Sequence, residues 1–147
     1  AAEMYTACVR IFPGVDMAVM SAAVADYTIS NPSPQKIKKQ HGTLTIELNK
    51  TADILKTMGE NKRDNQFLAG FALETNNEKE FALKKLHSKN ADMIVLNSLN
   101  DAGAGFGHNT NKITIFDKKG NEFHFDTKSK TALAADIVNT ILKISNA

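Results

Sequence analysis

Short segments that are apolar at nearly every position alternate along the chain with segments whose apolar residues recur at helical spacing. Three runs are apolar almost throughout and follow turn or helix-end residues: 15–20, 67–73 and 93–96. Such runs are typical of strands that are buried on both faces of a parallel sheet. Helical spacing occurs in four segments: 2–12, 53–62, 77–89 and 131–144. Buried strands that alternate with helices predict a layered α/β fold.

Alternation of polar and apolar residues predicts further strands. One covers 43–48, and two more, at 112–116 and 122–125, lie on either side of the turn sequence KKGN and predict a hairpin. Thr51 or Asp53 is expected to cap the helix at 53–62. No repeat, low-complexity segment or linker composition interrupts the pattern, so residues 1–147 are predicted to form one domain.

The first predicted element is a helix with no strand before it. A helix in a parallel sheet normally follows a strand. The Gly-x-Gly-x-x-Gly turn that opens many nucleotide-binding folds is also absent from the sequence. Together these observations predict that the N-terminal part of the domain is missing.

Composition and charge exclude several functional classes. The 147 residues carry a net charge of +2, so bulk charge does not favour nucleic acid or an anionic membrane as partner. No stretch approaches the roughly 20 apolar residues of a membrane span, and we expect a cytoplasmic protein. Cys8 is the single cysteine, which excludes an intrachain disulfide or a thiolate zinc cluster. The four histidines show no metal-ligand spacing, so no protein-held metal is predicted.

Candidate chemistry follows each predicted strand, because ligands of open α/β sheets bind beyond the carboxyl ends of the strands. After the first run, the small residues 21–25 allow close approach to the backbone, and Asp26 is either a ligand contact or a local cap. Lys36, Lys38 and Lys39 lie on a loop bounded by proline and glycine. They are either a lid over a polyphosphate or a solvated charge run.

Similar groups follow the second and third runs. Lys85 and Lys89 are four residues apart and share a helix face, which is either a basic patch or an ordinary wet surface. Asn97 ends the third run, where polar contacts to a ligand are common. Anion-binding groups and an aspartate after successive strands are what a nucleotide site in this fold class requires.

Five ordered motifs resemble the phosphopantothenoylcysteine synthetase (phosphopantothenate–cysteine ligase) domain family: AAVADY at 22–27, KIKK at 36–39, GFALETN at 70–76, KKLHSKNADMIVLN at 84–97 and GFGHNTNKITIF at 105–116. The resemblance implies a Rossmann-like domain with a mostly parallel sheet, which dimerises around the hairpin. It implies that 4'-phosphopantothenate attacks the α-phosphorus of CTP, with Mg²⁺ on the triphosphate, and that L-cysteine then attacks the acyl-cytidylate. In bacteria the family is usually fused to a flavin-dependent decarboxylase, so FMN is expected only with that half.

The resemblance also implies roles for individual residues. Lys36 is the expected catalytic lysine on the triphosphate, while Lys38 and Lys39 are expected in a flap. The expected CTP contacts are Met20, Ser21, Ala22, Asp26, Lys36, Ala52, Asp53, Ile54, Leu55, Phe71, Lys85 and Lys89. Ala52 stands where the family usually has proline.

The sequence departs from the family at its start. The glycine-rich opening and the asparagine that follows it in the family are not in these residues. An alternative function is therefore a fragment that binds nucleotide or dimerises without turnover of its own. A flavin- or NAD-binding oxidoreductase piece is disfavoured because the dinucleotide fingerprint is absent.

Overall fold

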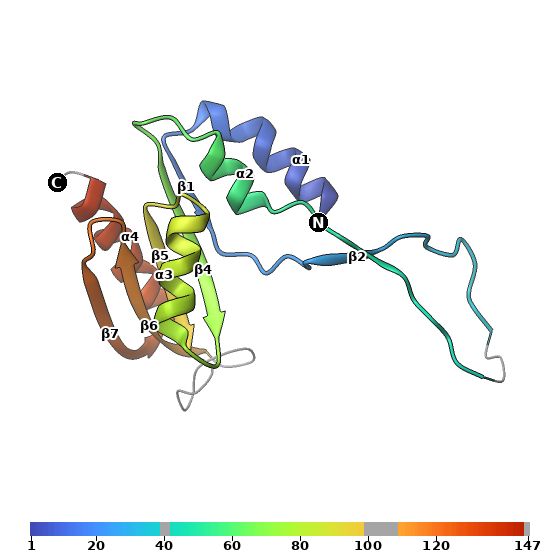
Figure 1. Cartoon of the computed structure of the whole chain (residues 1–147). Coiled ribbons are helices and arrows are strands. Elements are labelled where there is room, and N and C mark those ends of the chain that lie inside the picture. Colours follow the sequence, from blue (N-terminus) through green and yellow to red (C-terminus); the bar gives the residue numbers. More distant parts are fainter. Residues whose placement is uncertain (39–41, 99–108, 146–147) are drawn as a thin grey trace.

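Five strands form one mixed sheet within the residues that this computed structural model describes, which are 1–38, 42–98 and 109–145 (Figure 1). In sheet order they are β1 (Met17–Met20), β4 (Phe67–Glu74), β5 (Met93–Ser98), β6 (Thr110–Asp117) and β7 (Glu122–Ser129). β1, β4 and β5 pair in parallel, whereas β6 runs antiparallel to β5 and to β7. The α/β fold is confirmed, but a mostly parallel arrangement holds only for the first three strands.

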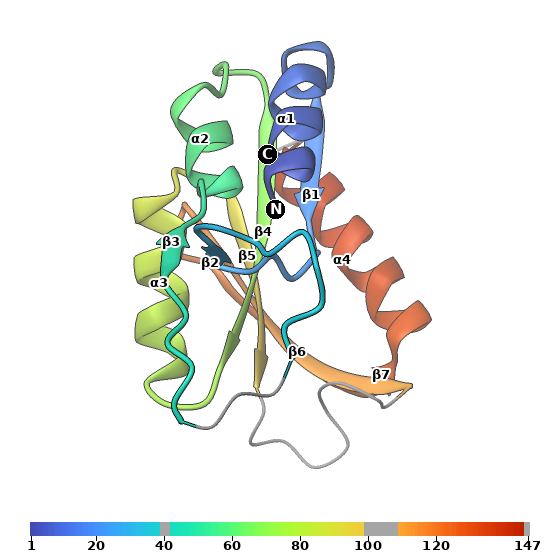
Figure 2. The same ribbon diagram turned by 90° about the vertical axis from the view of Figure 1, so that its right-hand side faces the viewer.

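Helices cover both faces of the sheet (Figure 2). The helices are α1 (Ala2–Ile11), α2 (Ile54–Glu60), α3 (Glu78–Ser88) and α4 (Lys130–Ser145), with a short 3₁₀ turn at Phe12–Gly14. Successive residues of β4 face opposite sides, as in any strand. Ala69 packs in the core layer that holds Leu133 and Ile141 of α4, whereas Ala72 packs in the layer that holds Leu86 of α3.

The predicted strand at 43–48 is wrong. The structure instead pairs two short strands, β2 (Tyr27–Ile29) and β3 (Leu48–Lys50), in a separate antiparallel ribbon that projects from the sheet (Figure 1). Leu44 and Ile46 stay 67% and 57% exposed. An alternating pattern forms a strand only where a neighbour satisfies its backbone and covers one face, and among the described residues 43–46 pairs with no strand.

Within the described residues the first apolar run forms an edge strand of the sheet, whereas the prediction was a strand buried on both faces. Among the described residues β1 pairs only with β4, and Met17 and Val19 remain 43% and 45% exposed. The run alone did not distinguish an edge from a centre, because both contain the same residue types. β4 and β5 match the prediction, since Leu68, Ala69 and Ile94 are fully buried.

The predicted helices and hairpin are confirmed, with differences at their ends. Asp53, and not Thr51, caps α2, because its Oδ1 accepts a hydrogen bond from the backbone N–H of Lys56 at 2.9 Å. Phe12 is buried directly after α1, whereas Ile11, the last residue of α1, is 55% exposed. At the hairpin turn the Asp117 carboxylate accepts from two backbone N–H groups of 118–121, which fixes the reversal.

A buried carboxylate joins three elements at the amino end of β5. Asp92 accepts hydrogen bonds from Lys62 Nζ at 2.7 Å, from the backbone N–H of Leu68 at 2.8 Å and from Lys118 Nζ. The side chains of Asp92 and Lys62 are only 4% and 7% exposed. This cluster ties the segment after α2, the start of β4 and the hairpin turn to the end of the sheet opposite the carboxyl ends of the parallel strands.

None of the helices in the described ranges is long and apolar enough to cross a bilayer.

Candidate functional site

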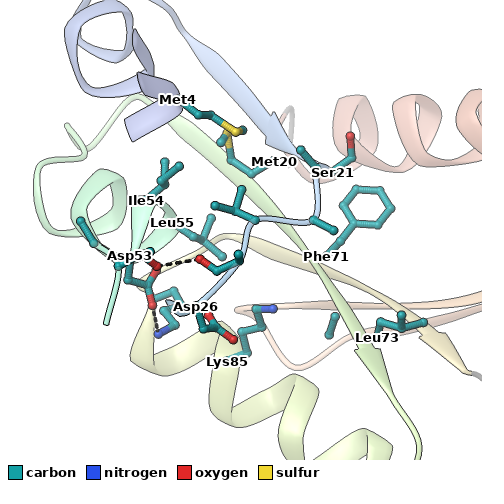
Figure 3. A pocket seen from close by; sticks show the side chains of 18 of the residues that line it. Met4, Met20, Ser21, Asp26, Asp53, Ile54, Leu55, Phe71, Leu73 and Lys85 are labelled. Atoms are coloured by element: carbon teal, nitrogen blue, oxygen red, sulfur yellow. Dashed lines mark hydrogen bonds and ion pairs between the residues drawn. The ribbon is translucent and has the colours of Figure 1, made fainter. Parts of the chain in front are cut away.

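A cavity of about 530 Å³ lies at the carboxyl ends of the parallel strands (Figure 3). Its walls come from the loop after β1, the segment 50–55 before and within α2, the end of β4, the lysines of α3, and Asn97 of β5. This is the edge where open α/β sheets bind their ligands. Side chains that are distant in the sequence therefore meet around a volume that suits a nucleotide.

The β2–β3 ribbon brings two walls of this pocket together. Tyr27 of β2 pairs with Lys50 of β3, and the contact continues past the ribbon. The backbone N–H of Thr51 donates to the carbonyl of Asp26 at 2.8 Å, and its Oγ1 donates to the carbonyl of Ala25 at 2.7 Å. These bonds place Asp26 beside the segment that ends in the α2 cap, Asp53.

An ion pair closes the wall between α2 and α3. Lys89 Nζ lies 2.6 Å from Asp53 Oδ2, while Asp53 Oδ1 caps α2. Burial tends to raise the pKa of the Asp53 carboxyl, but the hydrogen bonds from Lys89 and Lys56 and the charges of Lys89 and Lys85 outweigh it. The pKa therefore lies below its ordinary value of 3.8. Asp53 is thus ionised near neutral pH and neutralises part of the charge of this wall.

The other side of the pocket is apolar. Phe71, Leu55 and Met20 line it, and Figure 3 shows the Phe71 ring next to Ser21 at the end of β1. Leu55 packs directly against the backbone of β4 because residue 70 of that strand is glycine. A Cβ on Gly70 would lie only 2.6 Å from Leu55 Cδ2. An aromatic ring and aliphatic side chains next to charged groups suit a ligand with a planar ring and a polar tail.

The Asn97 amide lines the cavity at β5, and a second amide, that of Asn111, supports it from behind. Asn111 of β6, only 9% exposed, donates from Nδ2 to Asn97 Oδ1 at 3.1 Å and accepts from the backbone N–H of Lys112 at 3.0 Å. Since both polar ends of the Asn111 amide are engaged, it holds Asn97 in one orientation where that residue lines the pocket.

The charges around the cavity balance. Its lining holds three lysines, Lys50, Lys85 and Lys89, and three carboxylates, Asp26, Asp53 and Glu74. A polyanionic ligand therefore meets a wall with no net formal charge. Any strong preference for such a ligand needs cations from outside this lining.

Comparison with known proteins shows which family the chain belongs to. The sequence profile of the DNA/pantothenate metabolism flavoprotein C-terminal domain matches residues 1–144. The chain belongs to this family. The C-terminal domain of the coenzyme A biosynthesis bifunctional protein CoaBC, a member with a crystal structure, superposes with a TM-score of 0.74 at 40% identity over 98% of this chain. The resemblance to the phosphopantothenate–cysteine ligase domain of CoaBC, which the five sequence motifs indicated, is therefore confirmed.

Full-length relatives extend the comparison. CoaBC of Bacillus subtilis is 42% identical over 145 residues, which is 99% of this chain and 36% of that protein. A cysteine/cysteine sulfinic acid decarboxylase from an unknown prokaryotic organism is 51% identical over 98% of this chain and 40% of that protein. The DNA/pantothenate metabolism flavoprotein of Streptococcus pneumoniae shares the fold, with a TM-score of 0.72 at 18% identity.

This chain spans only part of these relatives. It covers 36% and 40% of the two full-length proteins and 64% of the solved CoaBC domain. The activity, substrates and partners of the whole protein are therefore matters for proposal.

The pocket gathers most of the residues that the ligase resemblance singles out. All the expected CTP contacts line it except Lys36: Met20, Ser21, Ala22, Asp26, Ala52, Asp53, Ile54, Leu55, Phe71, Lys85 and Lys89. Lys36 and Lys38 are exposed on the chain that extends beyond the β2–β3 ribbon. Lys39 and most of the glycine-rich segment 103–110 lie outside the described residues. No group of three or more His, Cys, Asp or Glu side chains in the described ranges is arranged to hold a metal.

Sequence reasoning missed part of the lining. Lys50 and Thr51 were assigned to no site, because their place depends on the β2–β3 pairing, which has no periodic signal in so short a ribbon. Glu74, which belongs to the motif at 70–76 but has no predicted role, lines the pocket together with Asn97. Met4 of α1 also lines the cavity.

Gly59→Ala is expected to destabilise the domain by about 1–3 kcal/mol, the range of a forced overpacking. A Cβ on Gly59 would lie 1.8 Å from the backbone oxygen of Lys89, and Asn90 Nδ2 already donates to the Gly59 carbonyl at 2.9 Å. The clash is with backbone, so α2 must move away from the end of α3, and Asp53 and Lys89 separate. Urea unfolding measures the effect. Gly14→Ala is the matched control, because nothing lies within 4 Å of its Cβ position; equal stability of the two variants would contradict the account.

Proposed function

We propose that this chain is the CTP-binding part of a phosphopantothenate–cysteine ligase of coenzyme A biosynthesis. The observation that carries the proposal is the cavity at the strand ends, which gathers separate motif residues of the ligase family around one volume. Membership of the family and 42% identity to a bifunctional CoaBC support the same assignment.

The proposed reaction has two steps. A carboxylate oxygen of 4'-phosphopantothenate attacks the α-phosphorus of CTP, the bond to the β-phosphate oxygen breaks, and pyrophosphate leaves. The amine of L-cysteine then attacks the acyl carbonyl carbon of the acyl-cytidylate, CMP leaves with the bonding electrons, and the amine loses a proton. The first step accumulates negative charge at phosphorus, so fixed cations must stand where that charge develops.

The pocket offers groups for each part of the nucleotide. Phe71 and Leu55 provide an apolar wall for the ring, and Asp26 presents acceptor oxygens for ribose hydroxyls. The small residues after β1 admit phosphate close to the backbone. Lys85 and Lys89 face the polyphosphate from α3. Mg²⁺ enters with the triphosphate as part of the substrate.

The charge balance of the lining assigns a role to the exposed lysines. The three lysine charges of the lining are offset by three carboxylates, so the lining has no net positive charge with which to bind a triphosphate. Lys36 supplies the missing cation when the segment beyond β2 folds onto the pocket, and Lys38 and Lys39 belong to the same flap. Lys36 lies seven residues after Ile29, a length that extends to about 25 Å, so it reaches the pocket without breaking the ribbon.

We further propose that the ligase works in the cytoplasm as a homodimer and that a flavin-dependent decarboxylase half is fused to it. FMN would belong to that half. The match to a protein named cysteine/cysteine sulfinic acid decarboxylase fits this arrangement, because the aligned part is 40% of that protein and leaves room for a separate catalytic half.

The test is pyrophosphate release by the full-length protein supplied with CTP, Mg²⁺, phosphopantothenate and cysteine. Release that depends on CTP and phosphopantothenate supports the ligase. A folded full-length protein that binds CTP but releases no pyrophosphate would instead support the alternative, a nucleotide-binding or dimerising module without turnover.

Asp26→Asn is expected to weaken CTP binding by about tenfold, the effect of losing one or two charge-assisted hydrogen bonds. The backbone carbonyl of Asp26, which accepts from Thr51, is unchanged by the substitution, so the wall stays in place. Titration calorimetry with CTP measures the change. Asp64→Asn, an exposed carboxylate outside the lining, is the control. Equal affinity of wild type and Asp26→Asn would make Asp26 structural.

A further inference from the structure

The ion pair between Asp53 and Lys89 places a carboxylate against a cation that the proposed function assigns to phosphate. Lys89 Nζ lies 2.6 Å from Asp53 Oδ2, and the dashed contact of Asp53 is visible in Figure 3. The Lys89 side chain is 22% exposed and the Asp53 side chain is 40% exposed, and both line the cavity. A ligand phosphate at this wall therefore meets a lysine whose positive charge is already partly neutralised by Asp53.

Asp53 is held by the helix cap as well as by Lys89, whereas Asp53 is the side-chain partner of the Lys89 ammonium. Asp53 Oδ1 accepts from the backbone N–H of Lys56, and this cap bond holds the carboxylate at the start of α2. Lys89 is the C-cap of α3, and its backbone N–H donates to the Lys85 carbonyl at 3.0 Å. Its ammonium stands at the end of four rotatable bonds and carries three donors. The ammonium is able to turn towards a phosphate, but the carboxylate does not follow it.

We propose that Asp53 is the resident counter-ion of Lys89, and that it competes with ligand phosphate for this lysine and so limits how tightly pyrophosphate is held. The inference rests on the proposed function, because it takes the cavity to be a phosphate site. Asp53 acts through Lys89 and is in this sense a positioning residue. When pyrophosphate leaves, Lys89 returns to a partner that is already in place.

The sign of the effect separates this role from a structural one. Removal of the Asp53 charge leaves Lys89 Nζ without its partner at 2.6 Å, so the full charge of this lysine becomes available to a ligand phosphate. Anion affinity rises as a result. A purely structural Asp53 has the opposite signature, since loss of the α2 cap disorders the wall and weakens binding.

Asp53→Asn isolates the charge, because asparagine caps a helix as well as aspartate does. We expect this variant to bind inorganic pyrophosphate about tenfold more tightly than wild type at low salt. Lys89→Met should bind it more weakly, and Asp53→Asn combined with Lys89→Met should equal Lys89→Met alone. Titration calorimetry with pyrophosphate measures all four proteins, and thermal unfolding checks that Asp53→Asn keeps the stability that Asp53→Ala loses.

Three results would overturn the inference: affinity that is unchanged or weaker in Asp53→Asn, tightening that persists without Lys89, and no pyrophosphate binding by any of the four proteins. The same proteins are titrated with CTP. If wild type binds CTP but Asp53→Asn shows no gain for pyrophosphate, only this inference fails. If no protein binds CTP, the proposed function fails with it.

Discussion

Lys36→Gln in the full-length protein is expected to lower kcat by on the order of 10²- to 10³-fold, the loss of one preorganised electrostatic contact in the transition state. The lining of the pocket has no net positive charge to offer a triphosphate. The charge that develops at the α-phosphorus therefore depends on a cation from outside the lining. Because Lys36 also supplies the cation that the bound triphosphate lacks, KM for CTP should rise as well, so kcat/KM should fall by more than kcat.

The control for this prediction lies two residues away. Lys38→Gln removes the same charge from the same exposed segment, and it should lower kcat by far less, since Lys38 belongs to the flap and not to the reacting centre. Initial rates of pyrophosphate release compare the two variants. A loss of less than about threefold in Lys36→Gln, roughly 0.7 kcal/mol, would refute the catalytic role.

Asp92→Ala is expected to lower the free energy of unfolding by about 3–5 kcal/mol, the cost of removing one partner from a buried ion pair. Lys62, only 7% exposed, would be left as a buried ammonium without its carboxylate, and the backbone N–H of Leu68 would lose its acceptor. Urea unfolding followed by circular dichroism measures the loss. Lys56→Ala is the control, because its exposed pair with Glu60 at 3.7 Å is worth at most about 0.5 kcal/mol.

The contribution of Asp92 also has a defined pH dependence. Burial raises the pKa of its carboxyl, but the hydrogen bonds from Lys118, Lys62 and Leu68 outweigh burial and hold the pKa below the ordinary 3.8. A carboxyl with a lowered folded pKa contributes its full stability above the unfolded value, and loses it as the pH falls through the folded value. Wild type should therefore lose stability below about pH 4, and the Asp92→Ala variant should lose less.

Combining Asp92→Ala with Lys62→Met should restore part of the stability that Asp92→Ala loses, because no buried charge is then left without a partner. Equal stability of the single and double variants would contradict the role of the Asp92–Lys62 ion pair.

Periodicity predicted the elements whose own residues decide their structure. β4 and β5 are buried on both faces, and their apolar runs contain no polar side chain that would favour a solvent-exposed position. The hairpin turn and the Asp53 cap depend on residues within a few positions. Asp26 and Asn97 of the pocket were predictable for a related reason: they follow strands, and the ends of parallel strands meet at one edge. The segment 52–55 was expected only from the family resemblance.

The features that the sequence did not reveal depend on distant contacts. The β2–β3 ribbon pairs residues that are about twenty positions apart over three residues each, so no window of the sequence holds its signal. β1 has the composition of a central strand, and only the sheet order shows that it lies at an edge of the described sheet. Asp92 appears in a polar turn, while its lysine partners lie 30 and 26 residues away. Gly59 resembles any helical glycine until the backbone of α3 is placed against it.

The most direct test of activation at this pocket is exchange of labelled pyrophosphate into CTP without cysteine. If the pocket activates the phosphopantothenate carboxylate, the full-length protein forms acyl-cytidylate and pyrophosphate reversibly. With CTP, Mg²⁺ and phosphopantothenate present, label should then enter CTP, and it should not do so without phosphopantothenate or in Lys36→Gln. A folded protein that binds CTP yet incorporates no label when phosphopantothenate is present would contradict activation at this site.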